Sequence, residues 1–170
     1  HYFGLKQFID GVAISYTSYL KRDYADKKGV RGSMLVTEKQ LNEAVLKAQQ
    51  ENIQVHLHVT GDEAVSLSLG AYENARDAAG NKDLRHSLEH IDIIDPADIK
   101  RIQASNTVAS MQPEHMAPTH DFKDNPYLER FGENRSKYAW AINSIMQSGA
   151  TVAFGTDYPV AVLNPMQGIY

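Results

Sequence analysis

The sequence predicts an α/β protein built around a parallel sheet. Five short apolar or β-branched runs alternate with helical patterns along the 170-residue chain. Strands that alternate with helices indicate βαβ units, and such units form parallel sheets. No signal reverses the strand direction, and right-handed crossovers can place successive strands side by side. From the residues alone, this pattern fits either an open sheet or part of a barrel.

The five predicted strands have the alternating pattern that gives each sheet face its own side chains. They cover residues 5–9, 53–59, 84–91, 107–111 and 151–154. Residues i and i+2 of a strand share a face, so His56 and His58 point the same way. In the third strand, one face carries His86, Leu88 and His90, and the other carries Arg85, Ser87 and Glu89.

The first two predicted helices are marked by their starts. Thr37 with Gln40 three residues later is a capping-box pattern, and helical spacing continues to about residue 52. Asp62 can cap the second helix, which ends near Gly80.

Two further helices follow the third and fourth strands. Asp95 precedes Pro96 as a cap, and that helix runs to about residue 104. The last helix is predicted over residues 136–147 and stops at Gly149. Long loops are predicted over residues 12–32 and 114–126, and loops of this length are often functional.

Composition excludes several classes of function. The net charge of −4 and pI near 6.0 give no basic surface for nucleic acid or an anionic membrane. No apolar run approaches the length of a membrane span. Cysteine is absent, so a metal would need His, carboxylate or modified Lys ligands. The localisation stays open. The first residues look like a strand already under way, so we expect the chain to begin inside a domain.

Polar residues close or follow each predicted strand. They are Lys6, His58, His90, His115 and Asp157. The carboxyl ends of parallel strands open onto one rim, so these side chains are expected to converge there. Three imidazole or carboxylate ligands without cysteine fit a catalytic zinc or a similar divalent ion with an open coordination position.

Ordinary structural roles are the alternatives at these positions. Asp157 could cap a turn, His58 and His90 could be packed strand histidines, and Lys6 could form a rim salt bridge. His115 could be a loop histidine without a role. An unrelated open α/β sheet would show no convergence of these groups.

Five motifs in order resemble the amidohydrolase superfamily over nearly the whole chain. They are GLKQFIDG, VHLHVTGDEAV, RHSLEHIDIIDPADI, ASMQPEHM and AWAINSIMQSGATVAFGTDYPV. More narrowly, these motifs resemble the group that includes N-substituted formamide deformylases and exoenzyme-regulatory proteins. This resemblance implies a metal-dependent (β/α)₈ barrel, of which the chain would contain strands four to eight with their helices.

The resemblance also implies a role for each rim residue. Lys6 resembles the fourth-strand lysine that bridges two metals when carboxylated. His58 and His90 resemble the fifth- and sixth-strand metal ligands, and Asp157 resembles the eighth-strand aspartate. His115 matches a histidine near the seventh strand that meets the substrate.

The run from His56 to His58 imitates the first-strand HxH motif of the family. Roughly 100 residues separate His58 from Asp157, which suits three βα units of about 30 residues but not seven. We therefore expect His56 to lie in the barrel interior. Residues 1–170 would be the C-terminal portion of the barrel, without the N-terminal strands, the true HxH and a small β-domain.

The implied activity is hydrolysis of a C–N bond in an amide, N-formyl or cyclic amide substrate. One or two divalent ions in the full-length protein, most simply zinc, would activate water, and Asp157 would accept its proton. The alternative is a catalytically incomplete fragment or a regulatory or binding protein on the same scaffold. Expected partners are a small-molecule substrate and either the missing N-terminal half or a second copy. Tyr16 and Glu63 stand where relatives often have arginine, so the substrate stays open.

Overall fold

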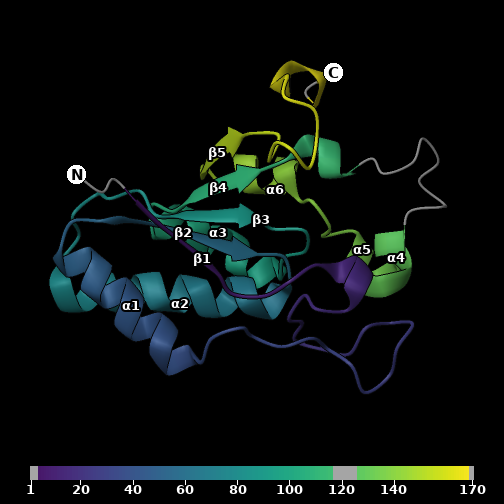
Figure 1. Cartoon of the computed structure of the whole chain (residues 1–170), viewed down its shortest axis with the longest axis horizontal. Helices are drawn as coiled ribbons and strands as arrows, with labels where there is room; N and C mark the ends of the chain where they lie inside the picture. Colours follow the sequence, from purple (N-terminus) through teal and green to yellow (C-terminus); the bar gives the residue numbers. More distant parts are fainter. Residues whose placement is uncertain (1–3, 117–125, 169–170) are drawn as a thin grey trace.

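A single parallel sheet of five strands organises the molecule. The computed structural model describes residues 4–116 and 126–168, and its strands lie side by side in chain order (Figure 1). The strands are β1 (Gly4–Phe8), β2 (Gln54–Val59), β3 (Ser87–His90), β4 (Val108–Met111) and β5 (Thr151–Phe154). All four neighbouring pairs are parallel, which confirms the predicted sheet.

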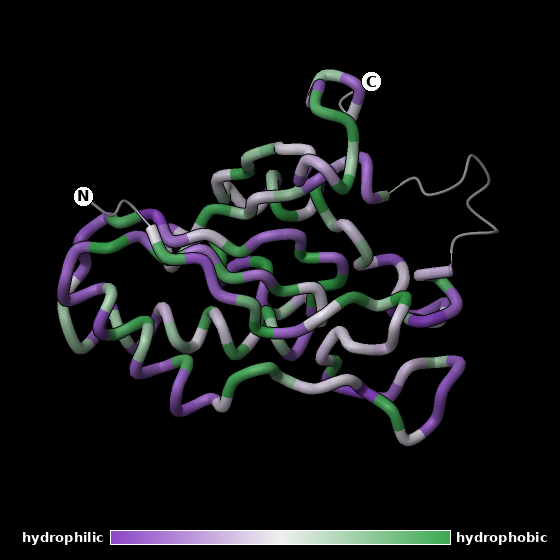
Figure 2. The backbone as a smooth tube through the Cα atoms, viewed as in Figure 1, coloured by the Kyte–Doolittle hydropathy of each residue, from purple (hydrophilic) through white to green (hydrophobic). Residues whose placement is uncertain are grey.

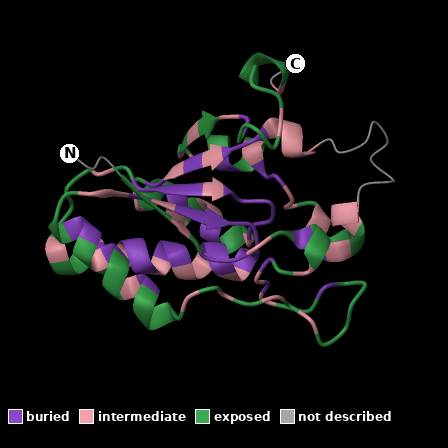
Figure 3. Cartoon of the chain, viewed as in Figure 1, coloured by how far each residue is buried: buried purple, intermediate pink, exposed green. Residues whose placement is uncertain are grey.

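Within the described residues, helices cover one face of this sheet. They are α1 (Glu38–Gln50), α2 (Asp62–Ala79), α3 (Pro96–Ala104) and α6 (Ile142–Gln147). On the covered face, strand side chains such as Leu57, Leu88 and Ala109 are at most 1% exposed (Figure 3). Apolar residues recur among polar ones along α1 and α2 (Figure 2). This is the pattern of amphipathic helices that pack one side against a sheet. The opposite face is open, and Phe8 there is 51% exposed.

The start of α1 confirms its prediction. The Thr37 hydroxyl accepts a hydrogen bond from the Gln40 backbone N–H, and the Gln40 side chain accepts one from the Thr37 N–H. The prediction that Asp62 caps α2 is wrong, because Gly61 is the N-cap and Asp62 is already helical. The Asp62 carboxylate instead accepts the Lys21 N–H at 2.9 Å and so anchors the preceding loop.

The predicted loop over residues 12–32 is ordered by a core of its own. It contains a short 3-10 helix, η1 (Ala13–Ser15), and buries Leu20 and Tyr24 against Ile93 and Phe131. Phe131 is the last residue of α4 (Pro126–Phe131). This second hydrophobic cluster therefore joins the loop over residues 12–32 to the helix that follows the other long loop. Of the predicted loop over 114–126, residues 117–125 lie outside the described part.

The predicted helix over residues 136–147 is wrong in its first half. The chain forms α5 (Glu133–Ser136) and then turns before α6. Trp140 adopts φ +41°, and its backbone N–H donates a hydrogen bond to the backbone carbonyl of Asp92 at 2.9 Å. This bond pulls the segment onto the end of β3 and interrupts the helix. Among the described helices, none is long and apolar enough to cross a membrane.

His86 is a structural residue on the helix-covered side. Its Nδ1 accepts the Val55 N–H at 3.0 Å, and its Nε2 donates to the Gln49 side-chain oxygen at 2.9 Å. Burial lowers the pKa of His86 from its ordinary value to about 4, and the neighbouring charge of His56 acts in the same direction. The folded protein therefore keeps this ring neutral at a pH where the unfolded chain protonates it.

We expect His86 to make stability fall on mild acidification. Between pH 7 and pH 5 the unfolded state takes up a proton that the folded state refuses, which removes about 1–2 kcal/mol of unfolding free energy. The His86→Gln variant keeps an acceptor for the Val55 N–H. Its unfolding free energy should fall by about 1–2 kcal/mol less between pH 7 and pH 5 than that of the unaltered protein. Urea unfolding at both pH values measures the difference. Equal losses in the two proteins would show that His86 is not the titrating group.

Candidate metal and active site

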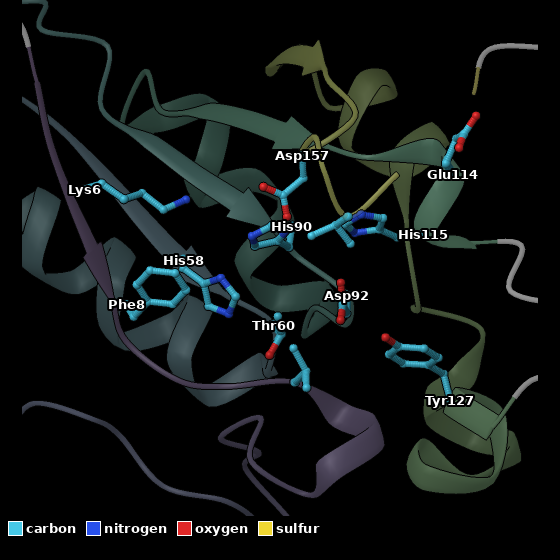
Figure 4. A pocket seen from close by; sticks show the side chains of 12 residues that line it. Lys6, Phe8, His58, Thr60, His90, Asp92, Glu114, His115, Tyr127 and Asp157 are labelled. Atoms are coloured by element: carbon cyan, nitrogen blue, oxygen red, sulfur yellow. The ribbon is translucent and has the colours of Figure 1, made fainter. Parts of the chain in front are cut away.

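A cavity of about 600 Å³ lies at the carboxyl ends of the strands (Figure 4). Side chains from β1, β2 and β3, from segments that follow the strands, and from α4 line it. They include all five rim residues predicted from the sequence, Lys6, His58, His90, His115 and Asp157. The structure therefore brings these side chains to one place, at the end of the sheet where parallel α/β proteins put their chemistry.

His58, near the end of β2, is held in one tautomer. Its Nε2 lies 2.9 Å from the Gly11 carbonyl oxygen. A carbonyl only accepts, so Nε2 carries the proton and Nδ1 keeps its lone pair. The same carbonyl accepts the Thr60 hydroxyl at 2.7 Å. Burial lowers the pKa of His58, so the ring is a neutral donor.

Asp10 fixes the turn that presents the Gly11 carbonyl. Its side chain is fully buried and accepts the backbone N–H groups of Tyr19, Thr60 and Gly61 at 2.8–2.9 Å. Burial raises the pKa of Asp10 to about 6, against the lowering effect of these bonds. In the sequence Asp10 is only half of an Asp-Gly turn signal. Its role in positioning His58 depends on contacts with residues about 50 positions away.

His90 closes β3 with an unusual backbone. Its φ is +80°, and Ile91 follows at φ +53°. Side chains with a Cβ rarely adopt such angles, least of all a β-branched one. The His90 ring lies 4.4 Å from the His58 ring, centroid to centroid, at 64°. Nδ1 donates to the Gln112 side-chain oxygen at 2.8 Å, which leaves the Nε2 lone pair available.

Regular alternation would have separated these two histidines. The register pairs His58 with Glu89, so His58 and Glu89 share the open face while Leu88 faces the helices. The predicted set of His86, Leu88 and His90 on one face is therefore wrong for His90. The positive φ at His90 turns its side chain out of that set and toward the cavity. The predicted strand over 84–91 is correspondingly shorter, at Ser87–His90.

His56 does not line the cavity. It lies on the open face in register with Lys6 and Ser87. Its Nδ1 bonds the Ser87 hydroxyl at 2.7 Å, which in turn donates to Glu89 at 2.5 Å. This chain of polar groups fills the open face beneath the cavity.

The other three predicted residues lie around the histidine pair. The His115 ring, on the 3-10 helix η2 (Pro113–Met116), stacks on His90 at 5.9 Å, and its buried Nε2 has no hydrogen-bond partner within the described residues. Asp157, at φ +55° after β5, raises the pKa of His58, His90 and His115 against the effect of burial. The Lys6 ammonium lies 5.7 Å from the Phe8 ring centroid.

The histidine pair fits the role of metal ligand in its chemistry. Burial, then the neighbouring charge of His58, lowers the pKa of His90 to about 4, so both rings are neutral at ordinary pH. Each ring has one nitrogen held by a protein acceptor and the other left with its lone pair, as metal-binding histidines require. Among residues 4–116 and 126–168, however, no three His, Asp or Glu side chains stand close enough together to hold a metal. Lys6 and Asp157 share the cavity without completing such a group.

Two further polar residues of this site were not predicted. Gln112 is buried and orients His90. Asp92 is 4% exposed, and burial followed by the charge of Asp10 raises its pKa to about 7. The sequence carries a signal for Asp92, since it follows His90 by two positions. Gln112 directly follows the fourth predicted strand, and the sequence pattern assigns it no role.

The fold and site define a class of protein. It is a parallel β/α-barrel segment with a polar site at the carboxyl ends of its strands. The chain belongs to the amidohydrolase family, whose model matches residues 4–170. It is 30% identical over 167 residues to "Protein LONG AFTER FAR-RED 3" of Arabidopsis thaliana, covering 98% of this chain and 28% of that protein.

Solved structures share this fold. An uncharacterized metal-dependent hydrolase from Pyrococcus furiosus matches at a TM-score of 0.84 and 26% identity, over 98% of this chain and 33% of its own. A second, from Pyrococcus horikoshii OT3, matches at 0.83 and 24% identity, over 98% and 32%. The chain thus spans about a third of the barrel proteins that it resembles.

Proposed function

We propose that this chain forms part of a metal-dependent hydrolase that cleaves C–N bonds in amide, N-formyl or cyclic amide substrates. The observation that carries the proposal is the neutral pair of His58 and His90 in one cavity. Each ring is fixed in the tautomer that leaves a nitrogen lone pair for a metal. A structural histidine such as His86 uses both ring nitrogens within the protein instead.

Each cavity residue has a proposed task. His58 and His90 would hold a divalent ion, most simply zinc, and Asp157 would join them as a ligand once the ion is bound. The ion would supply a water of lowered pKa and polarise the scissile carbonyl. Asp157 would take the proton of the attacking water and pass it to the leaving nitrogen. The buried Nε2 of His115 would hydrogen-bond the substrate. Lys6 would be carboxylated, because an ammonium repels a divalent cation, and a mass increase of one CO₂ would reveal it.

We further propose that residues 1–170 supply strands four to eight of a complete barrel. The supporting observations are an inner face that lies open in this chain, with Phe8 half exposed, and a match to one third of each related structure. In the described sheet, β1 and β5 also each have one unpaired edge. Unpaired edges recruit further strands, from the N-terminal part of the barrel or from a second copy. The remaining metal ligands, an HxH pair, would come from there.

The activity test uses the whole protein that carries this chain. It would be incubated with linear amides, N-formylamines and cyclic amides, first as purified, then after chelation, then after adding back zinc or another divalent ion. We expect hydrolysis of at least one class to disappear on chelation and return with the metal. Hydrolysis that survives chelation would contradict the proposal.

A second function is favoured by one observation. Within the described residues, the ligand set stops short of a three-residue metal group. A regulatory or binding protein on the amidohydrolase scaffold would have this arrangement. It would bind a small molecule in the cavity and turn over no C–N substrate, whichever metal is supplied.

A further inference from the structure

A buried carboxyl group stands in the cavity apart from the proposed ligands. Asp92 lines the cavity and is 4% exposed, and Figure 4 places it between the His90–His115 pair and the Tyr127 ring. The proposed hydrolysis gives this side chain no task. A carboxyl is costly to bury, so one that faces a cavity calls for a partner that enters the cavity.

The backbone holds Asp92 firmly in this position. The Ile91 N–H donates to the Val59 carbonyl at 2.9 Å, and the Ile93 N–H donates to the Thr60 carbonyl at 3.1 Å. The backbone carbonyl of Asp92 accepts a hydrogen bond from the backbone N–H of Trp140 at 2.9 Å. The left-handed angles of His90 and Ile91 lie immediately before it. Strained backbone of this kind is typical of functional sites, where it fixes side chains in advance.

The neighbouring polar groups are already engaged by hydrogen bonds within the protein. The Asp92 carboxyl lies beside the Trp140 side chain and lines the cavity, and within the described residues no cation pairs with it. The Thr60 hydroxyl bonds Gly11 and Ser18, and Asp10 accepts three backbone N–H groups. Around the cavity, the other side chains of the wall are apolar or aromatic, namely Phe8, Val12, Tyr127 and Val160.

Carboxyl groups outnumber amino groups in the lining of the cavity. Three carboxyl groups line it, Asp92, Glu114 and Asp157, against one ammonium, Lys6. Asp157 is assigned to the metal, and Glu114 points away from the other labelled side chains in Figure 4. Asp92 is the carboxyl that remains for a substrate, beside apolar walls that suit a hydrocarbon group.

We propose that Asp92 binds a cationic amine of the substrate, so that the preferred C–N substrates carry an amine joined to an apolar group. The inference rests on the proposed function for the hydrolysis step but not for the binding step. It assigns a substrate class to the cavity, and it excludes substrates whose corresponding substituent is anionic, because Asp92 would repel them.

The binding test uses the whole protein after removal of metal, so that an amine cannot coordinate it. Benzylamine and benzyl alcohol have nearly the same shape, and calorimetry compares their affinities. We expect benzylamine to bind at least about tenfold more tightly. Asp92→Asn should remove this preference and leave benzyl alcohol unchanged, whereas Glu114→Gln, which removes a charge from the same cavity, should keep it.

Two outcomes would overturn the inference. One is equal binding of amine and alcohol by the unaltered protein, which needs no variant to fold. The other is an equal loss of amine binding in Asp92→Asn and Glu114→Gln, which would indicate a general charge effect.

A substrate pair separates this inference from the proposed function. The 4-nitroanilides of 3-aminopropanoate and butanoate differ by an ammonium in place of a methyl group. The metal-loaded protein should cleave the first faster, and Asp92→Asn should reduce only that rate, by about tenfold. If the amine preference is present but neither anilide nor any other C–N substrate is cleaved, Asp92 recognition stands and the hydrolase proposal fails.

Discussion

Replacing His90 by alanine is expected to lower kcat/KM for C–N hydrolysis by at least about 1,000-fold in the whole protein. The His90 ring offers a lone pair at Nε2 beside the His58 ring. Its removal takes away a proposed metal ligand. Steady-state kinetics with saturating zinc would measure the loss.

His86 provides a matched control for this experiment. It is also a buried neutral histidine on the same segment, but it bonds Val55 and Gln49 on the helix side of the sheet. His86→Gln should reduce stability and leave kcat/KM within about threefold. A His90→Ala protein with full activity would contradict the ligand role. Equal losses in both variants would attribute the effect to packing.

Replacing Asp10 by alanine is expected to reduce the unfolding free energy by about 3 kcal/mol or more. The change leaves three backbone N–H groups without an acceptor. Those of Thr60 and Gly61 are buried, and that of Tyr19 is partly buried. It also frees the Gly11 carbonyl that holds His58. Urea unfolding measures the first effect, and a weaker metal affinity would report the second.

A surface aspartate tests whether this loss is specific. Asp23 likewise accepts a backbone N–H, that of Gly29 at 2.7 Å, but in an exposed part of the loop. Asp23→Ala should cost less than about 1 kcal/mol. Asp10→Asn, which retains one acceptor oxygen, should fall between the two. If Asp10→Ala were as stable as Asp23→Ala, the hydrogen bonds of Asp10 would not be what holds the ends of β1 and β2 together.

Local patterns were sufficient for most of the fold. Thr37 with Gln40 and Asp95 before Pro96 are caps made within four residues, and both helix starts were predicted from them. Gly149, at φ +85°, follows the last helix as expected. Asp62 failed as a cap because a loop 41 residues away takes its carboxylate. Tertiary contacts of this length leave no periodic signal.

The site could be predicted in its members but not in its geometry. Because parallel strands end at one rim, the sequence predicted a single group of polar residues there, and all of them line one cavity. They are Lys6, His58, His90, His115 and Asp157. Strand alternation could not show that His90 leaves its face, because that depends on two consecutive left-handed residues. The acceptor that orients each histidine, Gly11 or Gln112, lies 47 or 22 residues away. Such pairings appear only when the strands are side by side.

Metal content tests the central claim most directly. The whole protein, purified with zinc and dialysed, would be analysed for bound metal beside the His58→Ala/His90→Ala double variant and the His86→Gln control. We predict bound divalent metal in the unaltered protein and in the control, and a clear loss of at least one equivalent in the double variant. An unaltered protein that binds no metal, or a double variant that retains all of it, would contradict the account.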